Sequence, residues 1–288
     1  MHRSFHRFLS NKGIKTNGGM NPLLHCSGSA QWTFIQSNIE PKKSTVRKPL
    51  AIFVHGTGND RFFLTYDLFL QLLKNGISIF TFDLDGHGQK GSSLFHEKEI
   101  LNLFDSWLPL IREQHSEFNL HLIGNSLGGL LSANYLAKNT EHPFQTLTLL
   151  ATPENIQIGK DVVLPEISTI FQAEYYSYLR RWGIKDSIPA LGKFNRKRYP
   201  IRFEISSQDH YIDAVSKLSE RIPLSKSLKK IDIPVLAIYG HNDFIARPSD
   251  DILHLNHLSF EYVQTNHFLL PIYPRIFPVV AQHILDQN

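Results

Sequence analysis

The sequence predicts an α/β fold, with a mostly parallel central sheet flanked by helices and an inserted helical cap. Apolar stretches of strand length alternate with amphipathic stretches of helical length along most of the chain. The predicted strands are apolar throughout, which is typical of parallel strands covered on both faces. The alternation stops once, between Pro153 and about Ile231. With 288 residues and 42% hydrophobic content, the chain can bury a core of this size.

Six predicted strands and four predicted helices follow one another in order. The strands are 49–56, 77–84, 119–124, 144–153, 234–240 and 259–265, and the helices are 63–74, 97–114, 127–138 and 275–287. The helix over 97–114 is predicted from apolar residues that recur near helical spacing, such as Ile100, Phe104 and Leu108. Pro278 lies close enough to the start of the last helix to be tolerated there.

The chain is expected to divide into a tail, a core and a cap. Residues 1–29 are predicted to be a mobile basic tail, because the first 39 residues contain arginine and lysine but no acid. The core is predicted at 30–153 and 231–288. The segment 154–230 is too long for a loop and too poor in apolar strands for the sheet, so it is predicted to be the inserted cap.

The predicted cap combines an aromatic cluster with a basic cluster. The aromatic residues are Phe171, Tyr175, Tyr176, Tyr178 and Trp182, and the basic ones are Arg180, Arg181, Lys185, Lys193, Arg196, Lys197, Arg198 and Arg202. An apolar lid with a cationic rim suits an acyl chain with an anionic head group, or an acidic membrane surface. The alternative is that the aromatic residues pack the cap onto the core and the cations are solvated.

Composition excludes several other classes of protein. Cys26 is the only cysteine, so the chain has neither an internal disulfide nor a cysteine zinc site. The single cysteine suits a reducing compartment, and we predict a cytoplasmic location. Peripheral contact with a membrane, through the basic cap or the N-terminal tail, is a further interpretation that the charge pattern leaves open. No apolar run reaches the ~18 residues of a membrane span. No nucleic-acid partner is expected from the net charge of +4, because no recognition motif accompanies it. His254 and His257 are read as surface residues, and no metal or other cofactor is predicted.

The stretch LIGNSLGG, 122–129, is the strongest local motif. Ser126 lies two residues after Gly124 and two residues before Gly128, directly after a predicted strand. Small neighbours allow a sharp bend from strand to helix, and such a bend exposes the serine hydroxyl at the edge of the sheet. Ser126 is therefore the candidate nucleophile, although a glycine-rich turn would also produce so short a pattern.

A nucleophilic serine needs a base, and the base needs an acid that orients it. His267 follows the last predicted strand and is the candidate base, and Asp243 follows the strand before it and is the candidate acid. The rival residues are less well placed. Asp250 and Asp251 are better suited to capping a helix, and Asp209 lies in the predicted cap. His241 precedes Asp243 by only two residues and is expected at the surface, and His257 precedes the last strand.

Two backbone N–H groups are expected to stabilise a developing oxyanion. Leu127 opens the helix after the nucleophile, where the helix dipole favours negative charge. Thr57 follows the first core strand and is expected to supply the second N–H, and Gly56 beside it lets a substrate approach closely. The spacing of His55 and Asp60 also matches an H-x4-D acyltransferase pattern, which we reject because a histidine at a strand end is better explained structurally.

From about Ala30 to its end, the chain resembles serine hydrolases of the α/β-hydrolase superfamily. The chain order Ser126, Asp243, His267 is the order of that superfamily. The stretch FDLDGHGQKGS, 82–92, is similar to its Asp-x-x-Gly-His-Gly-x-Ser turn, with Lys90 and Gly91 inserted before the serine. Within the superfamily, Gly129 and the stretch 206–228 resemble the monoacylglycerol lipase and lysophospholipase group. Asn125 departs from the histidine that is frequent there, and carbon–carbon bond hydrolases also have asparagine.

The resemblance implies a carboxylic ester hydrolase, of the esterase or lipase type, that forms an acyl-enzyme. The expected partner is a small-molecule acyl ester, such as an acylglycerol or a lysophospholipid. The same residues could also serve a thioesterase or a carbon–carbon bond hydrolase. A non-catalytic ligand-binding protein is the alternative from another class, because a fold alone does not imply activity. The sequence does not predict the oligomeric state.

Overall fold

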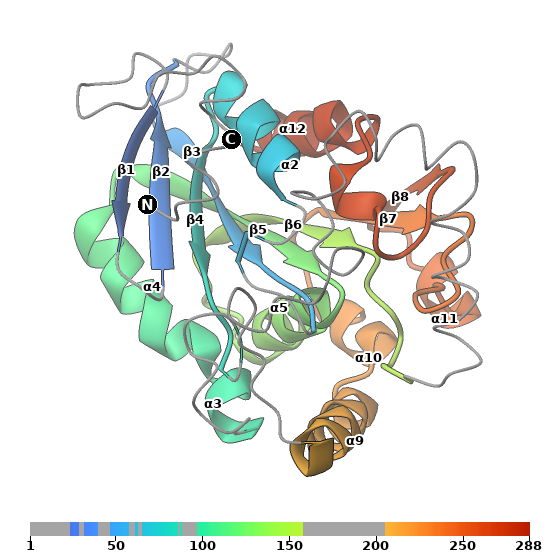
Figure 1. The fold of residues 1–288 in the computed structure, drawn as a ribbon. Coiled ribbons are helices and arrows are strands. Elements are labelled where there is room, and N and C mark those ends of the chain that lie inside the picture. The colour runs from blue at the N-terminus through green and yellow to red at the C-terminus, as the bar shows by residue number, and fades with distance from the viewer. Residues whose placement is uncertain are drawn as a thin grey trace.

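A central sheet of eight strands organises the described part of the chain (Figure 1). The computed structural model describes residues 24–28, 32–39, 47–57, 61–62, 65–85, 87, 97–157 and 205–288. The strand order is β1-β2-β4-β3-β5-β6-β7-β8. The strands are β1 (Leu24–Gly28), β2 (Trp32–Ser37), β3 (Lys48–Val54), β4 (Ser78–Phe82), β5 (Phe118–Asn125), β6 (Phe144–Leu150), β7 (Val235–Gly240) and β8 (Leu258–Val263).

The sheet is mostly parallel, as predicted. The pairs β4–β3, β3–β5, β5–β6, β6–β7 and β7–β8 are parallel, whereas β1–β2 and β2–β4 are antiparallel. Since β5, β6, β7 and β8 are consecutive parallel neighbours, the residues that follow these strands meet at one edge of the sheet. This edge is where ligands bind in open α/β sheets.

Helices cover both faces of the sheet. They are α2 (Tyr66–Lys74), α3 (Glu97–Leu101), α4 (Leu103–Gln114), α5 (Leu127–Lys138), α9 (Ile205–Arg221), α10 (Leu224–Leu228), α11 (Asp250–Leu253) and α12 (Ile276–Asp286), with a short 3-10 helix η2 (Leu270–Ile272). Figure 1 shows α2 and α12 together on one side of the sheet and α4 and α5 on the other. The sheet is thus buried on both faces, which explains why its strands are apolar throughout.

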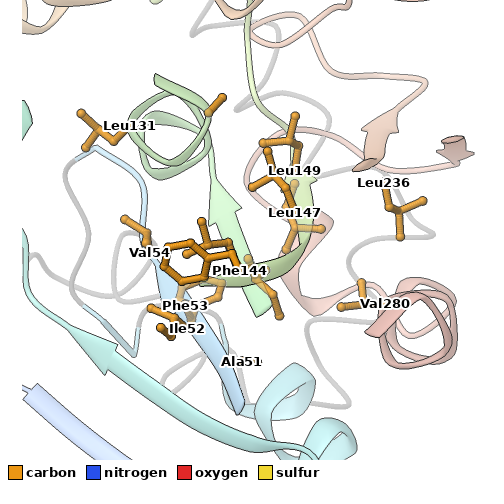
Figure 2. Close-up of a cluster of buried hydrophobic side chains, with 14 of the residues drawn as sticks. Ala51, Ile52, Phe53, Val54, Leu131, Phe144, Leu147, Leu149, Leu236 and Val280 are labelled. Atoms are coloured by element: carbon orange, nitrogen blue, oxygen red, sulfur yellow. The ribbon is translucent and has the colours of Figure 1, made fainter. Parts of the chain in front are cut away.

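The core lies between the central strands and the helices on either side (Figure 2). Ala51, Ile52 and Phe53 of β3 have no exposed surface, and Val280 of α12 is equally buried. Helix α5 is buried on nearly every side, including Gly128 and the polar Ser132. Ser132 meets its need for a hydrogen bond inside the helix, because Ser132 Oγ donates to the Gly128 carbonyl oxygen over 2.7 Å. This buried helix anchors the candidate nucleophile at its N-terminus.

The predicted fold class is confirmed, with two local corrections. The expected helix over 97–114 is divided into α3 and α4 at Asn102, a residue type that favours breaks and caps in helices. The predicted mobile tail, 1–29, is wrong at its end, because residues 24–28 form β1 and pair with β2. Neither β1 nor β2 was expected, since each is short and pairs antiparallel at the border of the parallel sheet.

The cap boundaries at 154–230 stay a prediction. Helices α9 and α10 lie within this segment, but residues 158–204 are outside the described part of the chain. The aromatic cluster and the basic cluster of the predicted cap both fall among those residues.

Candidate active site

The candidate nucleophile sits in a strained bend between β5 and α5. Ser126 has φ 51° and ψ −117°, a backbone conformation that non-glycine residues rarely adopt. Its backbone N–H donates to the Leu150 carbonyl oxygen of the neighbouring strand β6 over 2.9 Å. The bend is therefore held by the sheet itself, which fits the observation that backbone strain concentrates at functional sites.

Three glycines around Ser126 leave no room for side chains. A Cβ on Gly124 would lie 2.4 Å from the Gly129 Cα, and one on Gly129 would lie 2.0 Å from Thr152 Oγ1. A Cβ on Gly128 would lie 2.1 Å from the Val54 carbonyl oxygen, so the start of α5 packs directly on the end of β3. The glycine pattern in the sequence is thus explained by contact, and the bend could not form with larger residues.

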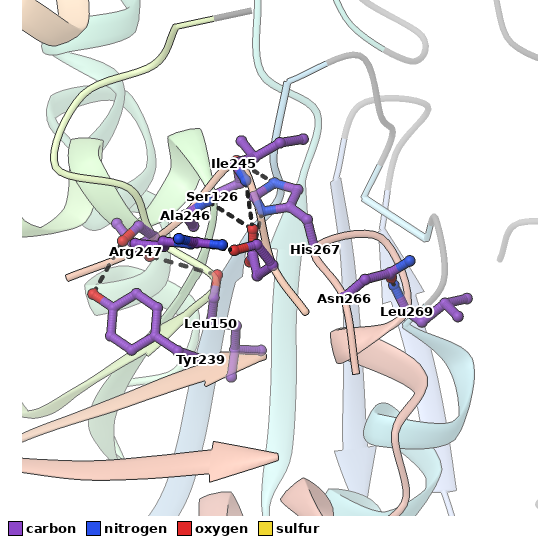
Figure 3. Close-up of polar contacts among 11 residues, drawn as sticks. Ser126, Leu150, Tyr239, Ile245, Ala246, Arg247, Asn266, His267 and Leu269 are labelled. Atoms are coloured by element: carbon purple, nitrogen blue, oxygen red, sulfur yellow. Dashed lines mark hydrogen bonds and ion pairs between the residues drawn. The ribbon is translucent and has the colours of Figure 1, made fainter. Parts of the chain in front are cut away.

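The structure brings Ser126, His267 and Asp243 into one hydrogen-bonded chain (Figure 3). Ser126 Oγ lies 3.1 Å from His267 Nε2. The other ring nitrogen, Nδ1, lies 3.0 Å from Asp243 Oδ2. With the proton on Nδ1, the ring donates to the carboxylate and accepts from the serine hydroxyl. This arrangement can remove the proton of Ser126 and stabilise the imidazolium that results.

Asp243 is fixed by more than the histidine. The side chain is fully buried, and its second oxygen, Oδ1, accepts from Ile245 N–H over 2.9 Å and from Ala246 N–H over 2.6 Å. A buried carboxylate needs such donors because it has lost its water. The backbone after β7 therefore holds Asp243 with one oxygen aimed at the ring. Backbone donors carry no side-chain signal, so the sequence could not indicate them.

The loop that carries His267 is tied to the loop that carries Asp243. The backbone N–H of Asn242 donates to the Thr265 carbonyl oxygen over 3.0 Å. Asn266, which is fully buried, accepts from Leu269 N–H through Oδ1 over 2.9 Å and thereby caps the turn that follows the histidine. Asn266 was not singled out from the sequence. The signal available was an asparagine, a common cap residue, directly before the candidate base.

The two expected oxyanion donors lie on neighbouring segments. Leu127 is the first residue of α5, so its N–H has no acceptor within the helix. Gly56 and Thr57 follow β3, whose end packs against Gly128. Beside them, His55 is a buried structural residue, because its Nδ1–H donates to the Gly56 carbonyl oxygen over 2.8 Å and its Nε2 accepts from Leu84 N–H over 3.0 Å. Burial lowers the pKa of His55 to about 4, which keeps its ring neutral.

None of the described rival residues reaches the site. Asp251 pairs with Lys229 over 2.9 Å, and Asp250 lies with it in the first turn of α11. His241 is exposed, and its ring packs against Tyr262 with a centroid distance of 5.5 Å. His257 Nε2 lies 3.1 Å from the Leu228 carbonyl oxygen. The side chain of Asp209 lies outside the described residues.

Neither a cluster of metal-binding side chains nor a membrane-spanning helix occurs among the described residues. Within them, no group of three or more histidine, cysteine, aspartate or glutamate side chains could hold a metal ion. No helix found there is both long enough and apolar enough to cross a membrane.

The fold and the arrangement of the site define the class of protein, a serine hydrolase of the α/β fold. The chain belongs to the family described as serine aminopeptidase, S33, whose family model matches residues 46–276. The matched range includes strand β3 and the three residues Ser126, Asp243 and His267.

Similar proteins include several hydrolases. The protein phosphatase methylesterase 1 of Debaryomyces hansenii is 25% identical over 167 residues, which are 53% of this chain and 42% of that protein. The enol-lactonase from Burkholderia xenovorans LB400 has a TM-score of 0.58 and 14% identity, over 90% of this chain and 95% of that one. The Paleococcus ferrophilus monoacylglycerol lipase has a TM-score of 0.54 and 18% identity, over 87% of this chain and 100% of that one. These two structural likenesses show the fold alone.

Proposed function

We propose that the protein hydrolyses a carboxylic ester through an acyl-enzyme formed on Ser126. The observation that supports this most directly is the hydrogen-bonded chain from Ser126 Oγ through His267 to the buried Asp243, with distances of 3.1 and 3.0 Å. A serine hydroxyl is a weak nucleophile until a base removes its proton, and an imidazole oriented by a carboxylate is such a base.

In the proposed first half-reaction, Ser126 Oγ attacks the ester carbonyl carbon while His267 Nε2 takes the hydroxyl proton. The negative charge that develops on the carbonyl oxygen is stabilised by the N–H groups of Leu127 and Thr57. The bond to the alkoxy group then breaks, and His267 gives its proton to the leaving oxygen. Asp243 remains ionised and stabilises the imidazolium.

In the second half-reaction, water attacks the acyl-enzyme and His267 takes its proton. The carbonyl oxygen again carries negative charge at the same two N–H groups. The bond to Ser126 Oγ then breaks, His267 returns the proton to the serine, and the carboxylic acid leaves. Ser126 forms and breaks the bond to the acyl group, His267 transfers each proton, and Asp243 stabilises the imidazolium. No cofactor takes part in these steps.

For the substrate we propose an acyl ester of the acylglycerol or lysophospholipid type. This proposal is supported by the sequence resemblance of Gly129 and of 206–228 to that group of enzymes. Methyl esters are a second candidate, because the relative that is similar over 167 residues is a methylesterase. A cytoplasmic location, with contact to an acidic membrane through the basic cap residues or the N-terminal tail, stays a proposal from composition and charge.

A panel of substrates tests this function. It contains esters of graded chain length, a monoacylglycerol, a lysophospholipid, a methyl ester, an acyl thioester and an aminoacyl amide, each assayed with the wild type and with Ser126→Ala. We expect ester turnover that Ser126→Ala abolishes, together with labelling of Ser126 by a fluorophosphonate. A higher kcat/KM for the thioester would favour the thioesterase. Absence of both turnover and labelling would favour a non-catalytic binding protein.

A further inference from the structure

A buried ion pair holds Arg61, which follows the proposed oxyanion donor Thr57 by four residues. Arg61 and Asp83 are 4% and 1% exposed. The guanidinium of Arg61 donates to Asp83 Oδ2, and the backbone N–H of Arg61 donates to Asp83 Oδ1 over 3.0 Å. Arg61 Nε also donates to Thr33 Oγ1 of β2 over 3.3 Å. One carboxylate thus fixes both the side chain and the backbone of Arg61.

The chain just before Thr57 is held by the residue next to Asp83. The backbone N–H of Leu84 donates to His55 Nε2 over 3.0 Å, and His55 Nδ1–H donates to the Gly56 carbonyl oxygen over 2.8 Å. Asp83 and Leu84 directly follow β4. The two consecutive residues Asp83 and Leu84 therefore bind the described residues on either side of Thr57. Leu84 binds His55, two residues before Thr57, and Asp83 binds Arg61, four residues after it.

Arg61 also supports the contact that His55 makes. The ring of His55 accepts from Leu84 N–H only while Nε2 carries no proton. Burial lowers the pKa of His55, and the positive charge of Arg61 lowers it further. The charge of Arg61 thus favours the neutral ring that the contact with Leu84 requires.

Stability alone is a weak reason for this ion pair. Removing two charges from water costs free energy that their attraction often does not return, and apolar residues of the same size frequently serve as well. What a buried pair with directed hydrogen bonds does supply is a fixed position. An oxyanion donor needs a fixed position, because a displacement of about 1 Å can cost roughly 100-fold in rate.

We propose that Asp83 and Arg61 are positioning residues that hold the Thr57 N–H where the oxyanion forms. The proposal rests on the proposed ester hydrolysis, since it concerns the same transition state. It assigns the pair a role in kcat and not in substrate affinity, because the oxyanion exists only in the transition state and the intermediates.

The test is Asp83→Asn, which keeps the shape of the side chain and one acceptor but removes the charge. We expect kcat for a short neutral ester to fall roughly 10- to 100-fold, with KM changed by less than about 2-fold. The affinity for a trifluoromethyl ketone, which forms a charged adduct with the serine, should fall by the same factor as kcat/KM. Arg61→Gln should also lower kcat. Arg61→Lys should lower kcat less than Arg61→Gln does, because lysine retains the positive charge of arginine but not its forked geometry.

A stability control separates positioning from loss of fold. Val280→Ala removes buried volume in α12, away from the loop, and it should lower the melting temperature while kcat stays unchanged. If Asp83→Asn and Arg61→Gln keep wild-type kcat, or lose no more than Val280→Ala at matched stability, the positioning role is wrong. If Asp83→Asn does not fold, Arg61→Gln decides by the same criterion. Wild-type turnover that survives Ser126→Ala would instead overturn the proposed function itself.

Discussion

Gly240, the last residue of β7, lies against the backbone of Thr265, so that a Cβ on Gly240 would be 2.3 Å from the Thr265 carbonyl oxygen. Asp243 follows Gly240 by three residues, and His267 follows Thr265 by two. The same carbonyl oxygen accepts from the backbone N–H of Asn242 over 3.0 Å. The distance between the candidate acid and the candidate base is therefore set by a backbone contact that only glycine permits.

Gly240→Ala should separate Asp243 from His267. The added methyl group must displace the backbone of Thr265, and we expect kcat to fall about 10-fold or more with a stability loss of about 1–3 kcal/mol. Steady-state kinetics and thermal unfolding measure the two effects.

Gly76→Ala is the matched control for that variant. Gly76 has φ 81° and lies before β4, at the opposite end of the sheet from the site, so alanine there is strained by about 1–2 kcal/mol. We expect the control to lose stability and keep kcat. Equal losses of kcat in the two variants would contradict the proposed role of the Gly240 contact.

Asp243→Asn should reduce turnover less than Ser126→Ala does. An amide can still contact the ring of His267, but it favours the wrong tautomer, and a loss of about 10⁴ in kcat is typical of such a change. Asp250→Asn is the control and should retain nearly full activity, because Asp250 lies in α11 and does not contact His267. Should Asp250→Asn prove as damaging as Asp243→Asn, the assignment of the acid would be wrong. Circular dichroism checks that each variant is folded.

Acid should destabilise the protein well above the pH at which carboxylates titrate. Burial lowers the pKa of His55 to about 4, of His87 to about 3 and of His121 to about 4. The unfolded chain takes up these protons near pH 6.5, so stability is full above that pH and is lost as the pH falls towards the folded pKa values. Between pH 7 and pH 5 we expect a loss of about 2 kcal/mol for each histidine.

Urea unfolding at several pH values measures this loss. His121→Gln removes one titrating group within β5, five residues before Ser126, so the stability of this variant should depend less steeply on pH than that of the wild type. A wild-type stability that is flat between pH 7 and pH 5 would contradict the prediction.

Charge reversal at Arg196, Lys197 and Arg198 should weaken binding to acidic vesicles and leave turnover of a short neutral ester unchanged. The basic cluster of the predicted cap carries these charges, and attraction between exposed charges is screened beyond about 8 Å at physiological ionic strength. Vesicle sedimentation at low and high salt is the measurement, and neutral vesicles are the control. Equal binding of the wild type and the charge-reversed variant to acidic vesicles at low salt would favour the alternative that these cations are only solvated. Loss of short-ester turnover would show that the cluster lies at the site or supports the fold.

Much of the architecture follows from local pattern. Apolar strands separated by amphipathic helices require a covered parallel sheet, and α5 was predicted at the bounds it has, Leu127–Lys138. Helix α5 is well defined in the sequence because the glycine bend begins it and an asparagine follows its last residue. The split between α3 and α4 and the strands β1 and β2 were missed, because a single Asn102 and two short antiparallel strands give weak periodic signals.

The sequence by itself determined which side chains are able to act: one serine between glycines, and an aspartate and a histidine after later strands. These positions follow from chain order, because the ends of neighbouring parallel strands meet at one edge of the sheet. Only the tertiary structure decided how they are held. The hydrogen bonds to Asp243 come from the N–H groups of Ile245 and Ala246, which are backbone atoms common to every residue. Two other contacts join segments far apart in sequence: Gly240 with Thr265, and Arg61 with Asp83. Such contacts have no local pattern, so they exist only once the chain has folded.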